Sequence, residues 1–194
     1  RCFSASQEVQ YTNVYNSRKH NFDLLRHLHF EDMVELINNS LPRDAGIVRI
    51  HVAGDFFNQD YLHAWYIVAL RNPRTLFYAY TKSLRYWVGD MTEMPDLWNF
   101  VLTASYGGRD DHMIDQFNLR SAKVVFSEAE AAELGLEIDH DDSHAAKPTL
   151  RDDSFALLIH GTQPKDSDAS KALKALKGKG SYSRNKKGAT SMIV

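Results

Sequence analysis

The apolar side chains of this chain recur with two spacings, and the first of them is helical. Between residues 22 and 37 they return at steps of mostly three and four, at Phe22, Leu25, Leu28, Met33, Leu36 and Ile37. This spacing predicts an amphipathic helix that is interrupted near Phe30. Residues 60–70 form a second helical stretch, which ends at the Asn72-Pro73 pair.

Short apolar runs rich in β-branched and aromatic residues predict strands between the helical stretches. There are five of these runs, over residues 47–53, 75–81, 100–105, 122–126 and 155–160. Two shorter helical segments are predicted over 111–118 and 128–135, the second with Ser127 as N-cap and Gly135 at its end. Alternation of strands and helices is typical of parallel strands joined by right-handed crossovers. We therefore predict an α/β fold of about five mostly parallel strands with crossover helices, as an open sheet or a partial barrel.

Composition and charge divide the chain into two parts. The 194 residues are 43% hydrophobic and 25% charged, which is ordinary for a globular protein. Residues 165–194 hold eight Lys or Arg and two Asp, a net charge of +6, whereas residues 1–164 hold 15 basic and 23 acidic groups, a net charge of −8. We expect residues 1–164 to form a single α/β domain and residues 165–194 to form a basic C-terminal extension.

The extension contains one segment with helical character, residues 169–180. Ser170 is a candidate N-cap, Leu173 and Leu176 share one face, and Gly178 and Gly180 should end the helix. A helix this short is marginal on its own. We therefore expect it to dock its leucines on the body of the protein, with its lysines facing water.

Candidate site residues follow each predicted strand, where ligands bind in parallel α/β folds. Asp55 and Lys82 are the candidate catalytic residues, although they could equally form a buried ion pair that holds two loops together. The candidate ligand-binding residues at the same edge are His51, Tyr80, Thr81, Ser83, Ser105, Arg109, His160 and Thr162. These side chains suit a small anionic ligand or a nucleotide. His51 alternates with apolar neighbours, so a core position is as well supported as a ligand contact.

Several familiar sites do not fit the chain. The Gly107-Gly108 pair beside Arg109 would suit an anion, but two glycines are a weak signal. The run Asp-His-Asp-Asp-Ser-His over 139–144 is interpreted as a solvated loop, and no metal site is expected. The phosphate-binding pattern G-x-x-x-x-G-K-[ST] is not present in the sequence, which argues against a P-loop nucleotide hydrolase.

The basic extension supports an alternative function, the binding of nucleic acid. Lysine and arginine side chains would contact phosphates, and Tyr182 could stack on a base. The candidate contacts are Lys174, Lys177, Lys179, Arg184, Lys186 and Lys187.

Two stretches carry a resemblance to a known family. The gene product 88 family of phage and phage-derived proteins is resembled by two stretches, RIHVAGDFF (49–57) and LFYAYTKSL (76–84). Three further stretches agree with this resemblance, namely RCFSASQ at the start of the chain, SRKHNFDLLR (17–26) and HGTQPKDSDASKAL (160–173). The resemblance covers most of the chain and singles out Asp55, Tyr80, Thr81, Lys82 and Ser83. It implies a cytoplasmic protein, in the cytoplasm of the host cell if phage-encoded. The one cysteine and the lack of a long apolar run agree with a reducing compartment and no membrane.

The resemblance gives no cofactor. Similar proteins look as if they carry a cysteine cluster upstream of the segment seen here. In this respect they resemble barrel enzymes that use an iron–sulfur cluster and S-adenosylmethionine. The chain begins with Arg1 rather than Met, so we expect residues upstream, where further cysteines could join Cys2. Cys2 alone cannot hold a cluster, which needs three or four thiolates, so the cofactor is left unknown.

Overall fold

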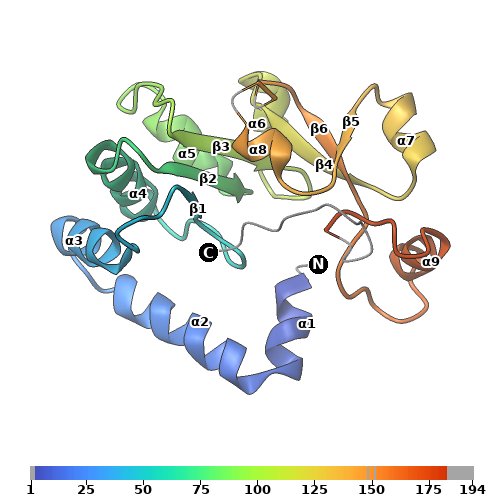
Figure 1. The fold of residues 1–194 in the computed structure, drawn as a ribbon, viewed down its shortest axis with the longest axis horizontal. Helices are drawn as coiled ribbons and strands as arrows, with labels where there is room; N and C mark the ends of the chain where they lie inside the picture. The colour runs from blue at the N-terminus through green and yellow to red at the C-terminus, as the bar shows by residue number, and fades with distance from the viewer. Residues whose placement is uncertain (1–2, 148, 151, 183–194) are drawn as a thin grey trace.

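The fold is a parallel sheet whose strands are connected by helices. A computed structural model of the protein describes residues 3–147, 149–150 and 152–182. In this part of the chain, six parallel strands form one sheet in the order β1-β2-β3-β4-β6-β5. The strands are β1 (Ile47–Arg49), β2 (Leu76–Thr81), β3 (Phe100–Ser105), β4 (Ser121–Val125), β5 (Glu137–Asp139) and β6 (Phe155–Leu158). Figure 1 shows that the sheet curls into an open half-barrel.

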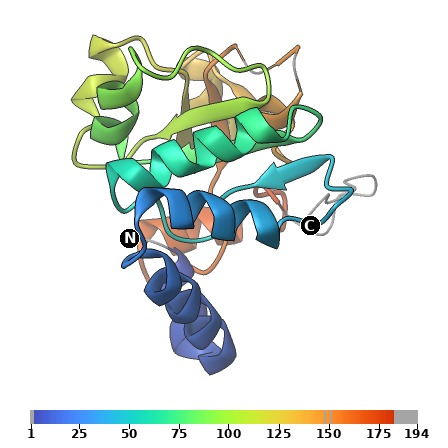
Figure 2. The same cartoon turned by 90° about the vertical axis from the view of Figure 1, so that its left-hand side faces the viewer.

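Helices connect successive strands and surround the curl. They are α1 (Phe3–Gln10), α2 (Thr12–Leu25), α3 (Phe30–Ser40), α4 (Gln59–Arg71), α5 (Leu84–Asp90), α6 (His112–Gln116), α7 (Glu128–Glu133), α8 (Ser143–Ala146) and α9 (Asp168–Ala175). Figures 1 and 2 show α1 and α2 extending away from the sheet and its surrounding helices. The described helices include none that is both long and apolar enough to cross a membrane.

The two faces of β2 have different partners because successive side chains of a strand point to opposite faces. Phe77 and Ala79 face outward and join the main core with apolar side chains of α3 and α4. Leu76 and Tyr78 face the concave side, where they pack with Val101 and with Ala145 of α8. Helix α8 therefore fills part of the concave face, against β2 and β3.

The predicted fold class is confirmed, with six strands in place of about five. The additional strand is β5, which has one apolar residue, Ile138, among its three and lies at the sheet edge beside β6. A segment this short and polar gives no strand pattern. The first strand ends at Arg49 rather than at residue 53, although the Ile50 amide still donates to the Tyr78 carbonyl at 2.9 Å. The interruption near Phe30 is confirmed, because α2 ends at Leu25 and α3 begins at Phe30.

Two local predictions need correction. Residues 139–144 are not a solvated loop, because Asp139, Asp142 and His144 are buried and α8 begins within this run. The N-cap of α9 is Ser167 rather than Ser170, since the Ser167 hydroxyl accepts the Ser170 amide at 3.1 Å.

Helix α9 presents two different faces. Leu173 and Leu176 are half-buried, and Leu176 packs with Val125 and Leu158. The lysines of α9 and of the turn after it are exposed. The division of the chain at residue 164 stays a prediction.

Candidate functional site

The Asp55 carboxylate joins the loops that follow β1 and β2. Its Oδ1 accepts the Thr81 hydroxyl at 2.6 Å and the Phe56 amide at 2.8 Å. Its Oδ2 accepts the backbone amide of Lys82 at 2.7 Å. Thr81 is 1% exposed, so its hydroxyl is committed to Asp55. Asp55 thus contacts Lys82 through the main chain, and the two loops are held as one unit.

The ammonium group of Lys82 reaches the next strand. Its Nζ donates to the carbonyl and hydroxyl oxygens of Ser105 at 3.1 and 3.2 Å, and to the Tyr106 carbonyl. The Ser83 hydroxyl reaches back and donates to the Phe56 carbonyl at 2.8 Å. Lys82 therefore links the carboxyl ends of β2 and β3.

The Gly107-Gly108 turn already holds an anionic group from the chain itself. The amides of both glycines donate to the Asp111 carboxylate at 2.8 Å each. Gly107 has φ +95°, a conformation that a residue with a side chain rarely adopts. The arrangement does suit an anion, and Asp111 supplies it.

A second cluster lies on the concave face around Asp142. Its Oδ2 accepts from Arg49 at 2.8 Å and from the Tyr78 hydroxyl at 2.9 Å, and its Oδ1 accepts from the Tyr80 hydroxyl at 2.8 Å and from the Tyr182 hydroxyl. Burial and the Asp142 charge raise the pKa of all three tyrosines. The three hydroxyls therefore remain protonated donors at neutral pH.

Arg49 connects this cluster to the loop after β1. Its Nε donates to the His51 carbonyl at 3.2 Å, and its guanidinium lies 5.2 Å from the centre of the Tyr80 ring. His160 lies beside the cluster, where its ring contacts that of Tyr182 edge-on at 4.9 Å and its Nδ1 bonds the Leu158 carbonyl at 3.0 Å. Burial lowers the pKa of His160.

A cavity of about 570 Å³ opens at the carboxyl end of β1, between the loop and the N-terminal helices. We call it the β1 cavity. Residues 50–55 and Phe57 form one wall, and side chains of α1, α2 and α4 form the rest, namely Glu8, Tyr15, Arg18, Lys19, Asn21, Phe22, Leu25 and Tyr61. Two of the candidate residues, His51 and Asp55, therefore line the same cavity, and α2 adds two cations to it.

The His51 ring is half-buried in this wall. Its Nε2 lies 3.2 Å from the Tyr61 hydroxyl, and its Nδ1 is buried with no hydrogen-bond partner among the described residues. Burial lowers the pKa of His51 to about 4, although Asp55 acts in the opposite direction. At neutral pH the ring is therefore uncharged. Both a core role and a ligand contact fit this environment.

Comparison with known proteins identifies the family. The family model described as Gene product 88 matches residues 1–178, nearly the whole chain. The chain belongs to the gene product 88 family. No curated protein and no solved structure matches it.

The remaining candidates of this gene product 88 protein are exposed or lie outside the described residues. Arg109 and Thr162 are exposed. Lys174, Lys177 and Lys179 are also exposed, around and after α9. Arg184, Lys186 and Lys187 lie outside the described residues, as does Cys2. Among the residues that are described, no group of three or more His, Cys, Asp or Glu is arranged to hold a metal ion.

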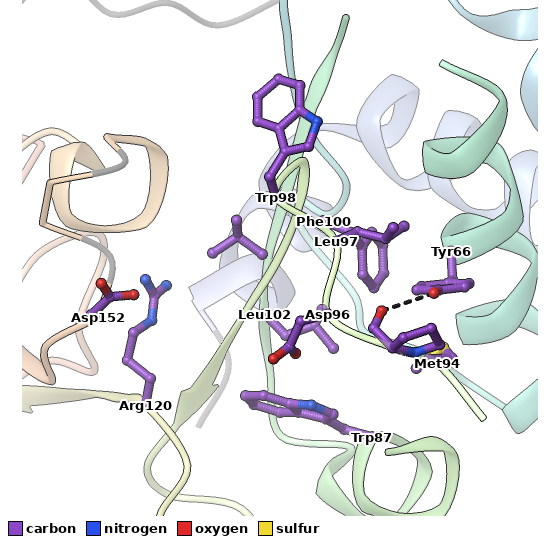
Figure 3. Close-up of a pocket in the computed structure, with 12 residues that line it drawn as sticks. Tyr66, Trp87, Met94, Asp96, Leu97, Trp98, Phe100, Leu102, Arg120 and Asp152 are labelled. Carbon is purple, nitrogen blue, oxygen red and sulfur yellow. Dashed lines mark hydrogen bonds between the residues drawn. The ribbon is translucent and has the colours of Figure 1, made fainter. Parts of the chain in front are cut away.

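A smaller cavity of about 350 Å³ lies at the opposite end of the strands. Figure 3 shows Arg120 and Asp152 on one side of it and Tyr66 and Met94 on the other. The Tyr66 hydroxyl donates to the Pro95 carbonyl at 2.8 Å. This cavity is lined by the beginning of β3 and contains no residue that the sequence singled out.

The Asp142 cluster was missed as a site by sequence reasoning. Arg49 did carry a signal, because a charged residue inside an apolar strand needs a buried partner. The identity of that partner was hidden, since Asp142 lies 93 residues further along the chain.

Proposed function

We propose that this protein is an enzyme, or is derived from one, and that it binds a small anionic ligand such as a nucleotide in the β1 cavity. One observation carries the proposal: the cavity lies at the carboxyl end of a parallel strand and is lined by both His51 and Asp55. This is the place where parallel α/β folds bind their ligands.

The charge and shape of the cavity support the ligand class. Arg18 and Lys19 bring positive charge to the α2 side, although each also has an acidic neighbour, Glu8 and Asp23. Phe57 stacks on Tyr61 with ring centres 4.5 Å apart, which gives the opposite side an aromatic wall. A ligand with an aromatic ring and a negatively charged group would use both features.

The proposed roles follow from the contacts. Asp55 is the candidate catalytic group because it lines the cavity, and His51 lines the same wall beside it. Three neighbouring side chains stabilise the cavity wall through hydrogen bonds. Thr81 donates to Asp55, Ser83 donates to the Phe56 carbonyl, and Lys82 donates to Ser105 at the end of β3.

Calorimetric titration of the full chain with ATP, AMP and adenosine tests the proposal. ATP should bind more tightly than adenosine, because adenosine has no charge for Arg18 and Lys19. Lys19→Ala should weaken ATP binding about threefold to fivefold, as expected for a partly exposed charge contact of up to ~1 kcal/mol.

Lys171→Ala is the matched control, because Lys171 also pairs with a carboxylate on its own helix but lies on α9. It should leave ATP binding unchanged. Equal affinity for ATP and adenosine, or no binding by either, would refute the proposed ligand class.

We infer a second candidate function, nucleic-acid binding, from the exposed face of α9. With Leu173 and Leu176 half-buried, Lys171, Lys174, Lys177 and Lys179 are left exposed. Such a surface could contact a phosphate backbone.

A further inference from the structure

The last described residues of the chain, Gly180, Ser181 and Tyr182, cross the carboxyl end of β6. Gly180 fits tightly there, since a Cβ atom would lie 2.5 Å from the Ile159 carbonyl oxygen. Ser181 is 1% exposed, and its hydroxyl accepts the Leu158 amide at 3.0 Å and donates to the Asp139 carbonyl at 2.5 Å. This short segment is therefore built into the sheet and into the loop after β5.

Tyr182 is held in an unfavourable backbone conformation at this point. Its φ is +61°, which residues with a side chain rarely adopt, and its amide donates to the His140 carbonyl at 2.9 Å. Its hydroxyl donates to Asp142, and its ring lies 5.8 Å from the Arg49 guanidinium. Such a conformation persists only where the surrounding contacts determine it.

These contacts lead from Tyr182 to the β1 cavity in three steps. Tyr182 bonds Asp142, Asp142 bonds Arg49 at 2.8 Å, and Arg49 bonds the His51 carbonyl at 3.2 Å. The Arg49 guanidinium also lies within 6 Å of two aromatic rings, those of Tyr80 and Tyr182. A charged side chain with this many directional contacts has little freedom to move.

We propose that Tyr182 is a positioning residue for the β1 cavity: by bonding Asp142 it fixes Arg49, and Arg49 fixes the backbone of His51 in the cavity wall. This inference rests on the proposed function, because it assigns Tyr182 to the same ligand site. It makes the site depend on a segment more than 120 residues away along the chain.

The test is Tyr182→Phe in the full chain, which removes the hydroxyl and keeps the ring. Two readouts need no ligand: the NMR signals of the His51 ring, and hydrogen exchange at the Ile50 amide, which makes the last ladder bond after β1. The His51 signals should shift, and exchange at Ile50 should rise about twofold to tenfold, as expected when one supporting hydrogen bond is removed. The affinity for ATP should fall as well.

Tyr66→Phe is the matched control, because it removes a tyrosine hydroxyl bond to the Pro95 carbonyl on the far side of β2. It should leave His51 and Ile50 unchanged. If Tyr182→Phe does not fold, Tyr182→Leu, which also removes the hydroxyl from Asp142, replaces it and should produce the same two changes. The inference is overturned if His51 and Ile50 behave as in the wild type in the folded variant.

The two proposals can fail separately. If the wild type binds no ATP but His51 and Ile50 change in Tyr182→Phe, the ligand proposal fails and the positioning of the wall stands. If ATP binds equally well to the wild type and to Tyr182→Phe, the ligand site stands and the positioning role fails.

Discussion

At the scale of single residues, two carboxylates each join several segments at the carboxyl end of the sheet. Asp55 accepts three hydrogen bonds from the loops after β1 and β2, and Asp142 accepts four from side chains on the concave face. Burial of a carboxylate is costly unless it is bonded in this way. Asp55 and Thr81 could be predicted together, because the carboxyl ends of parallel strands meet at one edge. Asp142 could not, because its partners come from β1, β2 and the C-terminal segment.

His51 gives a prediction about acid stability. Its pKa is about 4 in the folded protein, mainly because of burial, and rises to about 6.5 on unfolding. The unfolded state therefore takes up a proton between these values, and the stability that neutral His51 provides is lost as the pH falls below about 6.5. Between pH 7 and pH 5 this loss should be on the order of 2 kcal/mol.

Urea unfolding at pH 7 and at pH 5 gives the free energy of unfolding at each pH, and the difference measures this loss of stability. His51→Gln cannot titrate, so it should lose less stability than the wild type over this interval. His27→Gln, at an exposed position on the loop after α2, should keep the wild-type loss. Equal losses in the wild type and in His51→Gln would contradict the lowered pKa of His51.

At the scale of elements, the strands with a strong apolar pattern were predictable and the short polar elements were not. Strands β2 and β3 have buried side chains on both faces, and their continuous apolar runs made them visible in the sequence. β5 and α8 have three and four residues, and tertiary contacts rather than local pattern determine them. Asp139, for example, accepts the His144 amide at 3.1 Å and so shapes the turn into α8.

The exposed lysines of helix α9 and of the turn after it lead to a prediction about nucleic-acid binding. If its exposed lysines bind phosphates, affinity for a single-stranded oligonucleotide should fall steeply with salt, because each neutralised phosphate releases its counterions. The slope of log affinity against log salt concentration should be about −0.7 for each phosphate that the protein neutralises. Replacing Lys174, Lys177 and Lys179 together by Ala should therefore weaken binding and flatten this slope. The triple variant of Arg184, Lys186 and Lys187 shows whether the last residues contribute separately.

Fluorescence anisotropy over a salt series measures both effects. No binding at low salt, or binding that neither triple variant changes, would contradict nucleic-acid binding by the basic extension.

At the scale of the whole molecule, the half-barrel separates two ends with different chemistry. The carboxyl ends of the strands carry Asp55, Lys82 and the Asp142 cluster, whereas the amino ends carry the aromatic cavity around Tyr66. The parallel sheet could be predicted from the alternation of elements, and with it the edge that holds the candidate site, whereas the sequence left an open sheet and a partial barrel as alternatives. The cavity itself could not be predicted, because its far wall is α2, whose position beside β1 has no local sequence signal.

Chemical-shift mapping of the full chain with ATP tests the central claim most directly, because it reports where the ligand binds. We expect the shifts to concentrate at residues 51–57 and on α2 around Arg18 and Lys19. Shifts concentrated around Met94 and Trp98, or on α9, would place the ligand elsewhere and contradict the assignment of the β1 cavity as the ligand site.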